Sequence, residues 1–413
     1  MSPKRPSIRR RELLAGVAGL TAASASAGCL GLGVGGSGPA PGTDDSTDWP
    51  ERGNGPAGRS YAPDALAPRS GTSQRWATEV PWITDRPVVA EGLVLLPTAG
   101  PLVAYDTESG DEVWRYTPEV EGQPWFHSPA VRDGTVFATF REARGLAALS
   151  VEDGSVQWRA DVGPVSAPPL PVEDGSVPYV FVGDRRGRLT LLDDEGDSEW
   201  TYDLFGEVTT LHAPDRGLGQ RAYVGTSAGE VYAMYDDGGS PRGLWRRKLG
   251  GKVLSMAIDR GGDAYVSTFG GPTVRLRGGA HAGRTDWSNA RSGTLQEGLC
   301  AVDGRVYGAN LATLDALDTH EGKTAWTVDV GNDVDFTCGP VAAGDTLYVG
   351  RSGAVDGYKL GGGVGVGGTR LEARRFRHGV EGSPAGIAVA DGALFAAVES
   401  SDGPSRLLAL DPA

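Results

Sequence analysis

The side chains best suited to chemistry are few and scattered along the chain. Five histidines stand at positions 127, 212, 281, 320 and 378, and no two of them share the spacing of a metal site. Acidic stretches such as residues 106–110 and 318–322 end in glycine, but none has the Asp-x-Asp-x-Asp-Gly pattern of a calcium loop. Aspartate and glycine are also the residues that tight turns require. The acidic stretches therefore predict turns, and no metal site is predicted.

The first 29 residues predict export and a lipid anchor. Three arginines at 9–11 precede a small-residue apolar stretch at 15–27 that is too short to span a membrane, as in a twin-arginine signal. The segment from Ser26 to Cys29 is similar to a lipoprotein cleavage site, although a leucine usually stands where Ser26 does. We expect residues 1–28 to be removed and Cys29 to carry lipid. The protein would then sit on the extracellular face of the cell membrane, with secretion as the alternative.

Composition and charge narrow the class of protein and its partners. With 64 glycines and 27 prolines, the chain of 413 residues cannot be a helical bundle. The net charge is −14, and no basic stripe is visible that would bind phosphates, so nucleic acid is excluded as the main partner. Five lysines among many acids suit a salt-loving, archaeal source. Residues 29–48 predict a flexible tether, residues 49–72 a lead-in, and residues 73–413 the folded domain.

From residue 73 onward the sequence repeats. A tryptophan recurs about every 42 residues, after an alternating strand and an acidic turn that ends in glycine. A hairpin precedes each such pair, as at residues 129–137 around Asp133-Gly134. Phe376 takes the aromatic position in the seventh unit. The repeated tryptophans are Trp76, Trp114, Trp158, Trp200, Trp245, Trp287 and Trp326.

The two ends of the repeat region complete each other. The last strand, residues 407–411, has no aromatic after it, and residues 74–77 can supply the missing outer strand. Closing the ring in this way removes free sheet edges. The repeats therefore predict an all-β fold, an eight-bladed β-propeller of four-stranded blades closed by the N-terminal strand.

The repeat resembles the pyrroloquinoline-quinone (PQQ) repeat. The motif appears at residues 223–226, 229–234 and Trp245, and the resemblance covers about residues 73–413. It implies a PQQ-like propeller, such as the BamB-like exported lipoproteins, here of haloarchaeal type. In that family the repeated tryptophans dock neighbouring blades. The indole side chain suits this role because it combines a large apolar ring with one N–H donor. Trp82 and Trp125 lie outside the repeat, and either could stack on a ligand.

Two further sets of residues could form sites. Cys300 and Cys338 fall on inner strands of consecutive units, which usually lie too far apart for a disulfide, so we expect two buried free thiols, with a disulfide as the alternative. Polar residues also align at the mouth of the central channel. A propeller commonly binds its ligand there, but side chains at this rim also need to be polar simply because they contact water. The predicted rim residues are Asp85, His127, Ser166, Glu297, Asp335, Thr337 and Glu381.

The sequence favours a non-enzymatic scaffold or binding module. We expect it to be a monomer that presents a propeller face to protein partners or a small ligand. The alternative is a quinoprotein dehydrogenase with PQQ and Ca²⁺ in the central funnel. Quinoproteins of the family usually carry adjacent cysteines, and some carry a Cys-x-x-Cys-His haem motif, and neither is present. We therefore expect no catalytic residues, no cofactor and no metal. BamB-like proteins help to assemble outer-membrane proteins, a role that an archaeal lipoprotein would not share.

Overall fold

The computed structural model describes most of the chain, and residues 38–413 form one compact unit. Regular structure in this unit is almost entirely β-strand, with one short 3₁₀ turn, η1 (Gly279–His281). No helix in the described part of the chain is long and apolar enough to cross a membrane. The described residues are 39–141, 145–174, 177–214, 221–292, 295, 298–331, 334–363, 365–366, 369–370 and 373–413.

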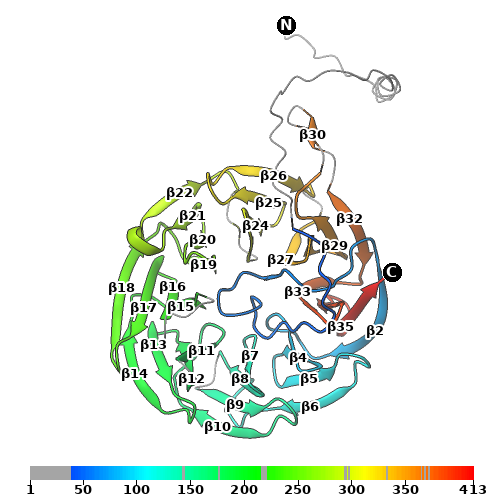
Figure 1. The fold of residues 1–413 in the computed structure, drawn as a ribbon. Coiled ribbons are helices and arrows are strands. Elements are labelled where there is room, and N and C mark those ends of the chain that lie inside the picture. Colours follow the sequence, from blue (N-terminus) through cyan, green and yellow to red (C-terminus); the bar gives the residue numbers. More distant parts are fainter. Residues whose placement is uncertain are drawn as a thin grey trace, which may run out of the picture. The chain divides into compact units, whose positions relative to one another are not determined.

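The strands form eight antiparallel blades around a central axis (Figure 1), which confirms the predicted fold. Blades 1 to 4 each use four consecutive strands. Blade 1 is β3 (Val88–Ala90), β4 (Leu93–Pro97), β5 (Leu102–Asp106) and β6 (Glu112–Tyr116), and blade 2 is β7 (Ala130–Arg132), β8 (Thr135–Thr139), β9 (Leu146–Ser150) and β10 (Val156–Ala160). Blade 3 is β11 (Leu170–Asp174), β12 (Val177–Gly183), β13 (Arg188–Leu192) and β14 (Ser198–Asp203), and blade 4 is β15 (Val208–His212), β16 (Arg221–Thr226), β17 (Glu230–Asp236) and β18 (Pro241–Lys248).

Blades 5 to 8 complete the ring. Blade 5 is β19 (Val253–Ile258), β20 (Ala264–Thr268), β21 (Thr273–Leu276) and β22 (Thr285–Asn289), and blade 6 is β23 (Leu299–Val302), β24 (Arg305–Ala309), β25 (Thr313–Asp318) and β26 (Thr324–Asp329). Blade 7 is β27 (Phe336–Ala343), β28 (Thr346–Arg351), β29 (Ala354–Lys359) and β32 (Arg374–Gly379), with β1 (Tyr61–Ala62) added in parallel to β27. Blade 8 is β33 (Ser383–Ala390), β34 (Ala393–Glu399), β35 (Ser405–Pro412) and β2 (Thr72–Val80). A small hairpin, β30 (Gly365–Val366) and β31 (Thr369–Arg370), lies outside the blades.

The N-terminal strand closes the ring, as predicted. β2 pairs with β35 in antiparallel register, with Trp76 opposite Ala409. Strands from the two ends of the described propeller therefore share blade 8. β2 covers the outer edge of β35, which would otherwise be unpaired, and covering a free edge is the usual reason for such closure.

In seven blades an aromatic ring on the second strand packs against the aromatic ring on the fourth strand, and in blade 1 Leu95 takes the place of the first ring. In blade 4, Tyr223 on β16, Ala233 on β17 and Trp245 on β18 stand opposite one another, and the two rings meet with centroids 5.5 Å apart. A bulge follows next to Trp245, at Ala233/Met234. A small middle residue lets the two large rings touch, which is why the alternating strand before the turn so often carries Ala or Gly at this position.

The tryptophans also join each blade to the next one. The Trp76 indole N–H donates to the Thr107 carbonyl at 2.9 Å, and that of Trp114 donates to the Val151 carbonyl at 2.8 Å. A Cβ at Gly110, which has φ +75°, would lie 2.6 Å from the Trp76 ring. The glycine that ends each acidic turn thus provides both the left-handed backbone and the space for the preceding blade's indole.

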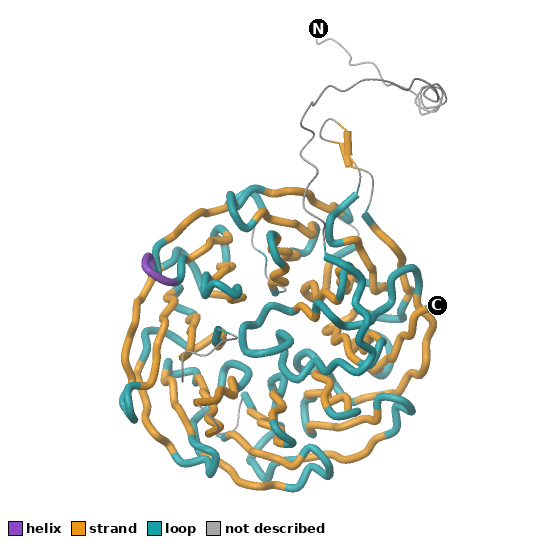
Figure 2. Tube along the Cα trace, in the orientation of Figure 1, coloured by secondary structure: helices purple, strands orange, loops and turns teal. Residues whose placement is uncertain are grey.

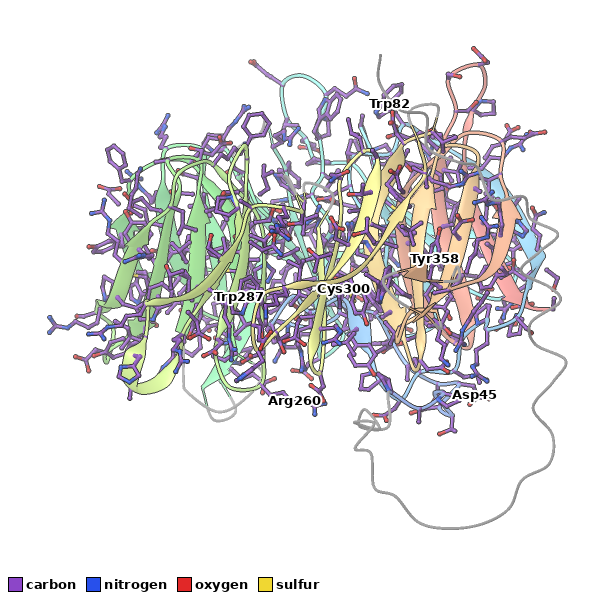
Figure 3. All side chains as sticks on the ribbon, turned by 90° about the horizontal axis from the view of Figure 1, so that it is seen from above. Asp45, Trp82, Arg260, Trp287, Cys300 and Tyr358 are labelled. Atoms are coloured by element: carbon purple, nitrogen blue, oxygen red, sulfur yellow. The ribbon has the colours of Figure 1, made fainter. Side chains whose placement is uncertain are left out.

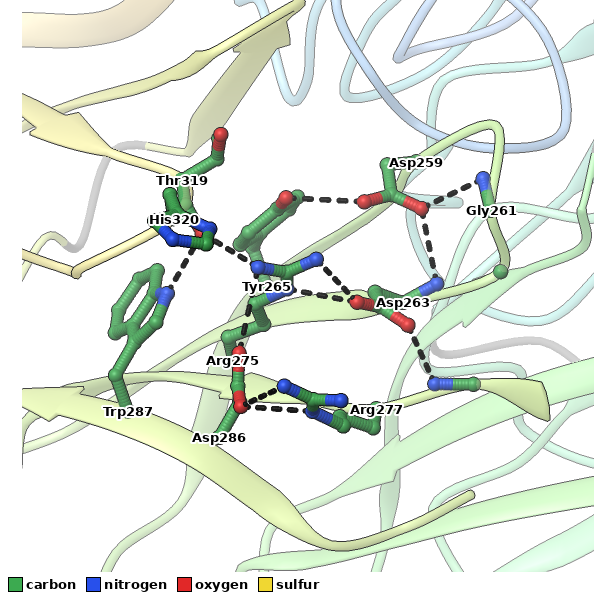
Figure 4. Close-up of polar contacts among 12 residues, drawn as sticks. Asp259, Gly261, Asp263, Tyr265, Arg275, Arg277, Asp286, Trp287, Thr319 and His320 are labelled. Carbon is green, nitrogen blue, oxygen red and sulfur yellow. Dashed lines mark hydrogen bonds and ion pairs between the residues drawn. The ribbon is translucent and has the colours of Figure 1, made fainter. Parts of the chain in front are cut away.

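Blade 5 replaces the small middle residue with an arginine (Figure 4). Arg275 lies between Tyr265 and Trp287, and its guanidinium donates to the Asp263 carboxylate at 2.7 Å. The Thr319 carbonyl of blade 6 accepts from both Arg275 (2.7 Å) and the Trp287 indole (2.9 Å). This blade junction is therefore held by a charged network as well as by ring packing.

Candidate functional site

The centre of the propeller is occupied by the chain's own lead-in (Figures 1 and 2). We call residues 49–62 the hub segment. Its backbone hydrogen-bonds the channel-facing backbone of successive blades, groups that would otherwise face an open channel. These bonds include Trp49 N to Val89 O (2.7 Å), Val131 N to Pro50 O (2.9 Å), Ala213 N to Pro56 O (2.8 Å), Ile258 N to Ala57 O (2.8 Å), Ala301 N to Arg59 O (2.8 Å) and Ala342 N to Ser60 O (2.9 Å).

Asp85 is the best-connected of the predicted rim residues. Its carboxylate accepts from the Arg52 guanidinium at 2.9 Å and from the backbone N–H groups of Arg86 (2.9 Å) and Ser128 (3.2 Å). Burial alone would raise its pKa, but the charge of Arg52 and these hydrogen bonds hold the pKa well below its usual range. Asp85 is therefore a charged anchor that ties the hub segment to blades 1 and 2.

Two histidines lie beside the hub in neutral form. His127 is 6% exposed, with Nδ1 3.9 Å from the Asp85 carboxylate and Nε2 3.3 Å from the Val165 carbonyl. Burial lowers the pKa of His127 to about 4, against the opposing effect of Asp85. Burial, with the charge of Arg52, also lowers the pKa of His212 to about 4. Neither imidazole is poised near pH 7 for proton transfer.

The other predicted rim residues do not converge on one site. Ser166 Oγ donates to the Val208 carbonyl and Thr337 Oγ1 to the Pro384 carbonyl, both at 2.7 Å, so each hydroxyl links its blade to the next. Asp335 is exposed, and Glu381 is exposed and pairs with Arg406 at 3.0 Å. Glu297 lies outside the described residues. Among the described rim residues, only Asp85 and His127 come together.

The two propeller cysteines are both free and buried. The Cys300 thiol donates to the Ser60 carbonyl of the hub segment at 3.3 Å, and burial raises its pKa far above the usual value. A thiol of this kind is not nucleophilic. Cys300 therefore helps to seat the hub segment.

The cavity that the described residues enclose at the hub is small. Its volume is about 50 Å³, and its lining includes Arg52, Arg86, Leu170, His212, Met256 and Leu299. Pockets for drug-sized ligands typically measure about 300–1,000 Å³, so a tricyclic quinone does not fit this space. Within the described residues, no group of three or more His, Cys, Asp or Glu could hold a metal ion. The residues present do not fit PQQ with Ca²⁺.

Three exposed aromatics lie on one face, of which the sequence analysis named Trp82 as a residue that could stack on a ligand but did not predict Phe205 or Phe269. Trp82, Phe205 and Phe269 are 60%, 63% and 65% exposed. Trp82 lies on the face opposite Asp45 and Arg260 (Figure 3). Their signal in the sequence is weak, because each is a single aromatic in a loop that the repeat does not specify. Trp125 is half-buried in the same loop region, where its backbone bridges to Ala99.

Comparisons with known proteins agree with this architecture. A family model described as outer membrane protein assembly factor BamB (PQQ_2) matches residues 64–209 and 144–241. No curated protein matches the chain. BamB from Moraxella catarrhalis has a similar structure, with 18% identity, 83% of this chain and 98% of that chain covered, and a TM-score of 0.62. Quinohemoprotein alcohol dehydrogenase from Comamonas testosteroni is 14% identical, with 88% of this chain and 80% of that chain covered and a TM-score of 0.65. The C-terminal WD40 domain of Sif2 is 9% identical, with 84% of this chain and 100% of that chain covered and a TM-score of 0.65.

At these identities the structural likenesses show the fold alone. The fold is that of an eight-bladed β-propeller. Over residues 64–241, the family match adds a likeness to the outer membrane protein assembly factor BamB.

Proposed function

We propose that this chain is an exported, lipid-anchored scaffold that binds protein partners on a face of its propeller and performs no catalysis. The observation that carries the proposal is the hub segment, which occupies the centre of the propeller and hydrogen-bonds its inner strands. When the centre of a propeller is filled, the loops on its two faces are the surfaces that remain available for binding. The likeness to BamB, whose family model is described as an assembly factor, supports the same class of function.

The competing function is a quinoprotein dehydrogenase, because a quinohemoprotein is among the similar folds. Equilibrium dialysis of the purified protein with PQQ and Ca²⁺, followed by dye-linked alcohol oxidation, separates the two. The scaffold proposal expects neither retained quinone nor turnover. Stoichiometric quinone binding with turnover would overturn it.

The anchor has its own test. Cys29→Ser removes the only thiol that could take the lipid at the expected cleavage site, so the variant should move from the membrane fraction to the medium. The matched control is Cys300→Ser, which changes a buried thiol and should leave the fractionation unchanged. Unchanged membrane association of Cys29→Ser would contradict the anchor.

A further inference from the structure

A continuous basic surface runs over blades 3, 4 and 5. Its loops are linked by backbone hydrogen bonds, so they form one surface. The bonds are Leu204 N to Gly187 O (2.7 Å), Ser227 N to Glu207 O (2.8 Å), Leu249 N to Gly229 O (2.7 Å) and Phe269 N to Lys252 O (2.8 Å). We call this surface the basic arc; its cations are Arg185, Arg186, Arg188, Arg246, Arg247, Lys248 and Lys252, all exposed.

The basic arc lies on the face that also bears Trp82. The Trp82 carbonyl accepts from Ala99, in the loop between the second and third strands of blade 1. Blade symmetry puts the corresponding loops of blades 3 to 5 on the same face. The blade 3 loop holds Arg185 and Arg186, and the backbone bonds above join the blade 4 and blade 5 loops to Leu249 and Lys252, which follow the end of β18. Asp45, near the point where the chain enters the propeller, lies on the opposite face (Figure 3).

The arc is positive in a chain whose net charge is −14. Its acids are Asp161, Asp184, Asp203, Glu207 and Glu230, which leaves seven cations against five carboxylates. Glu230 is already engaged by Arg246 at 2.8 Å and Lys248 at 3.6 Å. Arg186, Arg247 and Lys252 form no ion pair with the described residues. These three cations are available to a partner.

Two exposed rings stand among these charges. The Lys248 ammonium lies 5.9 Å from the centroid of the Phe205 ring, and the Phe205 N–H donates to the Tyr232 hydroxyl at 3.2 Å. The Phe269 N–H is held by Lys252, as above. Each ring therefore projects from a fixed backbone, which lowers the entropy that binding would cost.

We propose that the basic arc is the docking site for an acidic segment of a protein partner, with carboxylates on the arginines and apolar side chains against Phe205 and Phe269. The inference rests on the proposed scaffold function and names the face and the chemistry of the partner. Five of the seven cations are arginines, whose planar guanidinium matches a carboxylate in two parallel hydrogen bonds.

A narrow polypeptide fits this face better than an anionic bilayer does. The same face carries the loop with exposed Glu119 and Glu121, joined to the blade 1 loop by the bond from Gly100 N to Pro124 O (2.9 Å). A flat bilayer would press against both the arc and these carboxylates, whereas a peptide contacts the arc alone.

The test uses the full mature chain and a labelled poly(Glu,Tyr) peptide, with poly(Lys,Tyr) as the reversed-charge probe, read by fluorescence anisotropy. The arc variant is Phe205→Ser with Arg247→Glu and Lys252→Glu. The matched control is Trp82→Ser with Lys323→Glu and Lys359→Glu, which makes the same change in net charge and also removes one exposed aromatic ring, at exposed sites outside the arc. Thermal melts verify that both variants fold.

We expect the wild type and the control to bind poly(Glu,Tyr) alike, the arc variant to bind at least about tenfold more weakly, and high salt to weaken binding. Equal binding by both variants, or none by the wild type, overturns the inference. So does arc-dependent binding to phosphatidylglycerol vesicles without binding to the peptide. In-cell crosslinking separates failure of this inference from failure of the scaffold function. A partner that crosslinks equally to both variants would support the scaffold function and contradict docking on the arc. Quinone turnover would contradict the scaffold function itself.

Discussion

At the scale of single residues, the repeat couples six of its seven tryptophans to a glycine in the next blade, the exception being Trp200. The sequence predicted the tryptophans as docking residues and the glycines as turn residues. It could not show that the two requirements meet in one contact, because the glycine lies in a different repeat from the indole that covers it. Gly154 beside Trp114 and Gly322 beside Trp287 repeat the arrangement of Gly110. Pattern analysis along the chain does not see such contacts.

Trp200→Ala should lower the free energy of unfolding by about 3–5 kcal/mol, as large aromatic truncations in cores do. Trp200 is 7% exposed, and its indole donates to Asp236 at 2.7 Å. The control is Trp82→Ala, at an exposed loop, which should change stability by less than about 0.5 kcal/mol. Chemical denaturation measures both, and equal losses would contradict blade docking.

The buried histidines predict how stability depends on pH. Their pKa values near 4 in the folded state lie below the value of about 6.5 expected after unfolding. The unfolded chain therefore binds protons that the folded chain does not, and stability should fall as the pH drops from about 6.5 to about 4. Asp85, with a lowered pKa, loses its contribution only below about 3.9.

Denaturation midpoints at pH 7 and pH 5 test this. The double variant His127→Gln, His212→Gln should lose less stability than the wild type between these two pH values. The matched control His320→Gln, in an exposed turn, should keep the wild-type dependence. A double variant as steep as the wild type would show that other groups carry the effect.

At the scale of elements, the sequence predicted the blades and their closure but not the hub segment. Strand alternation, hairpin turns and the missing C-terminal aromatic identify β2 and β35 as partners. The hub segment binds through backbone groups at Pro50, Pro56 and Ser60, and such bonds leave no periodicity in side-chain type. The rim shows a related limit of pattern: the sequence aligns Ser166 and Thr337, but it does not show that their hydroxyls donate to backbone carbonyls of the next blade.

The closing strand can be tested by truncation. A chain that begins at residue 70 keeps β2, and a chain that begins at residue 85 loses it, while both lack the hub segment. The shorter chain should melt at a clearly lower temperature or aggregate, because β35 and one face of blade 8 become exposed. Equal melting temperatures would mean that β2 contributes little to closure.

At the scale of the whole molecule, the propeller is a closed ring whose centre is fastened by the hub segment, and the proposed docking site lies on one face. Two features distinguish that face: the basic arc over blades 3 to 5 and the exposed rings within it. The cations form two short runs in the sequence, residues 185–188 and 246–252, but the sequence does not show that blades 3 and 4 bring the two runs to one surface or that Phe205 and Phe269 stand beside them. A filled hub and a charged face together favour partner binding over catalysis.

Hydrogen exchange of the innermost strands tests the filled hub most directly. Amides of Val131, Ile258, Ala301 and Ala342 bond the hub segment, so in the full chain they should exchange as slowly as amides in the middle strands. In the chain that begins at residue 70 the same amides should exchange faster, while the middle strands stay protected. Fast exchange of these amides in the full chain would show an open channel and contradict the account.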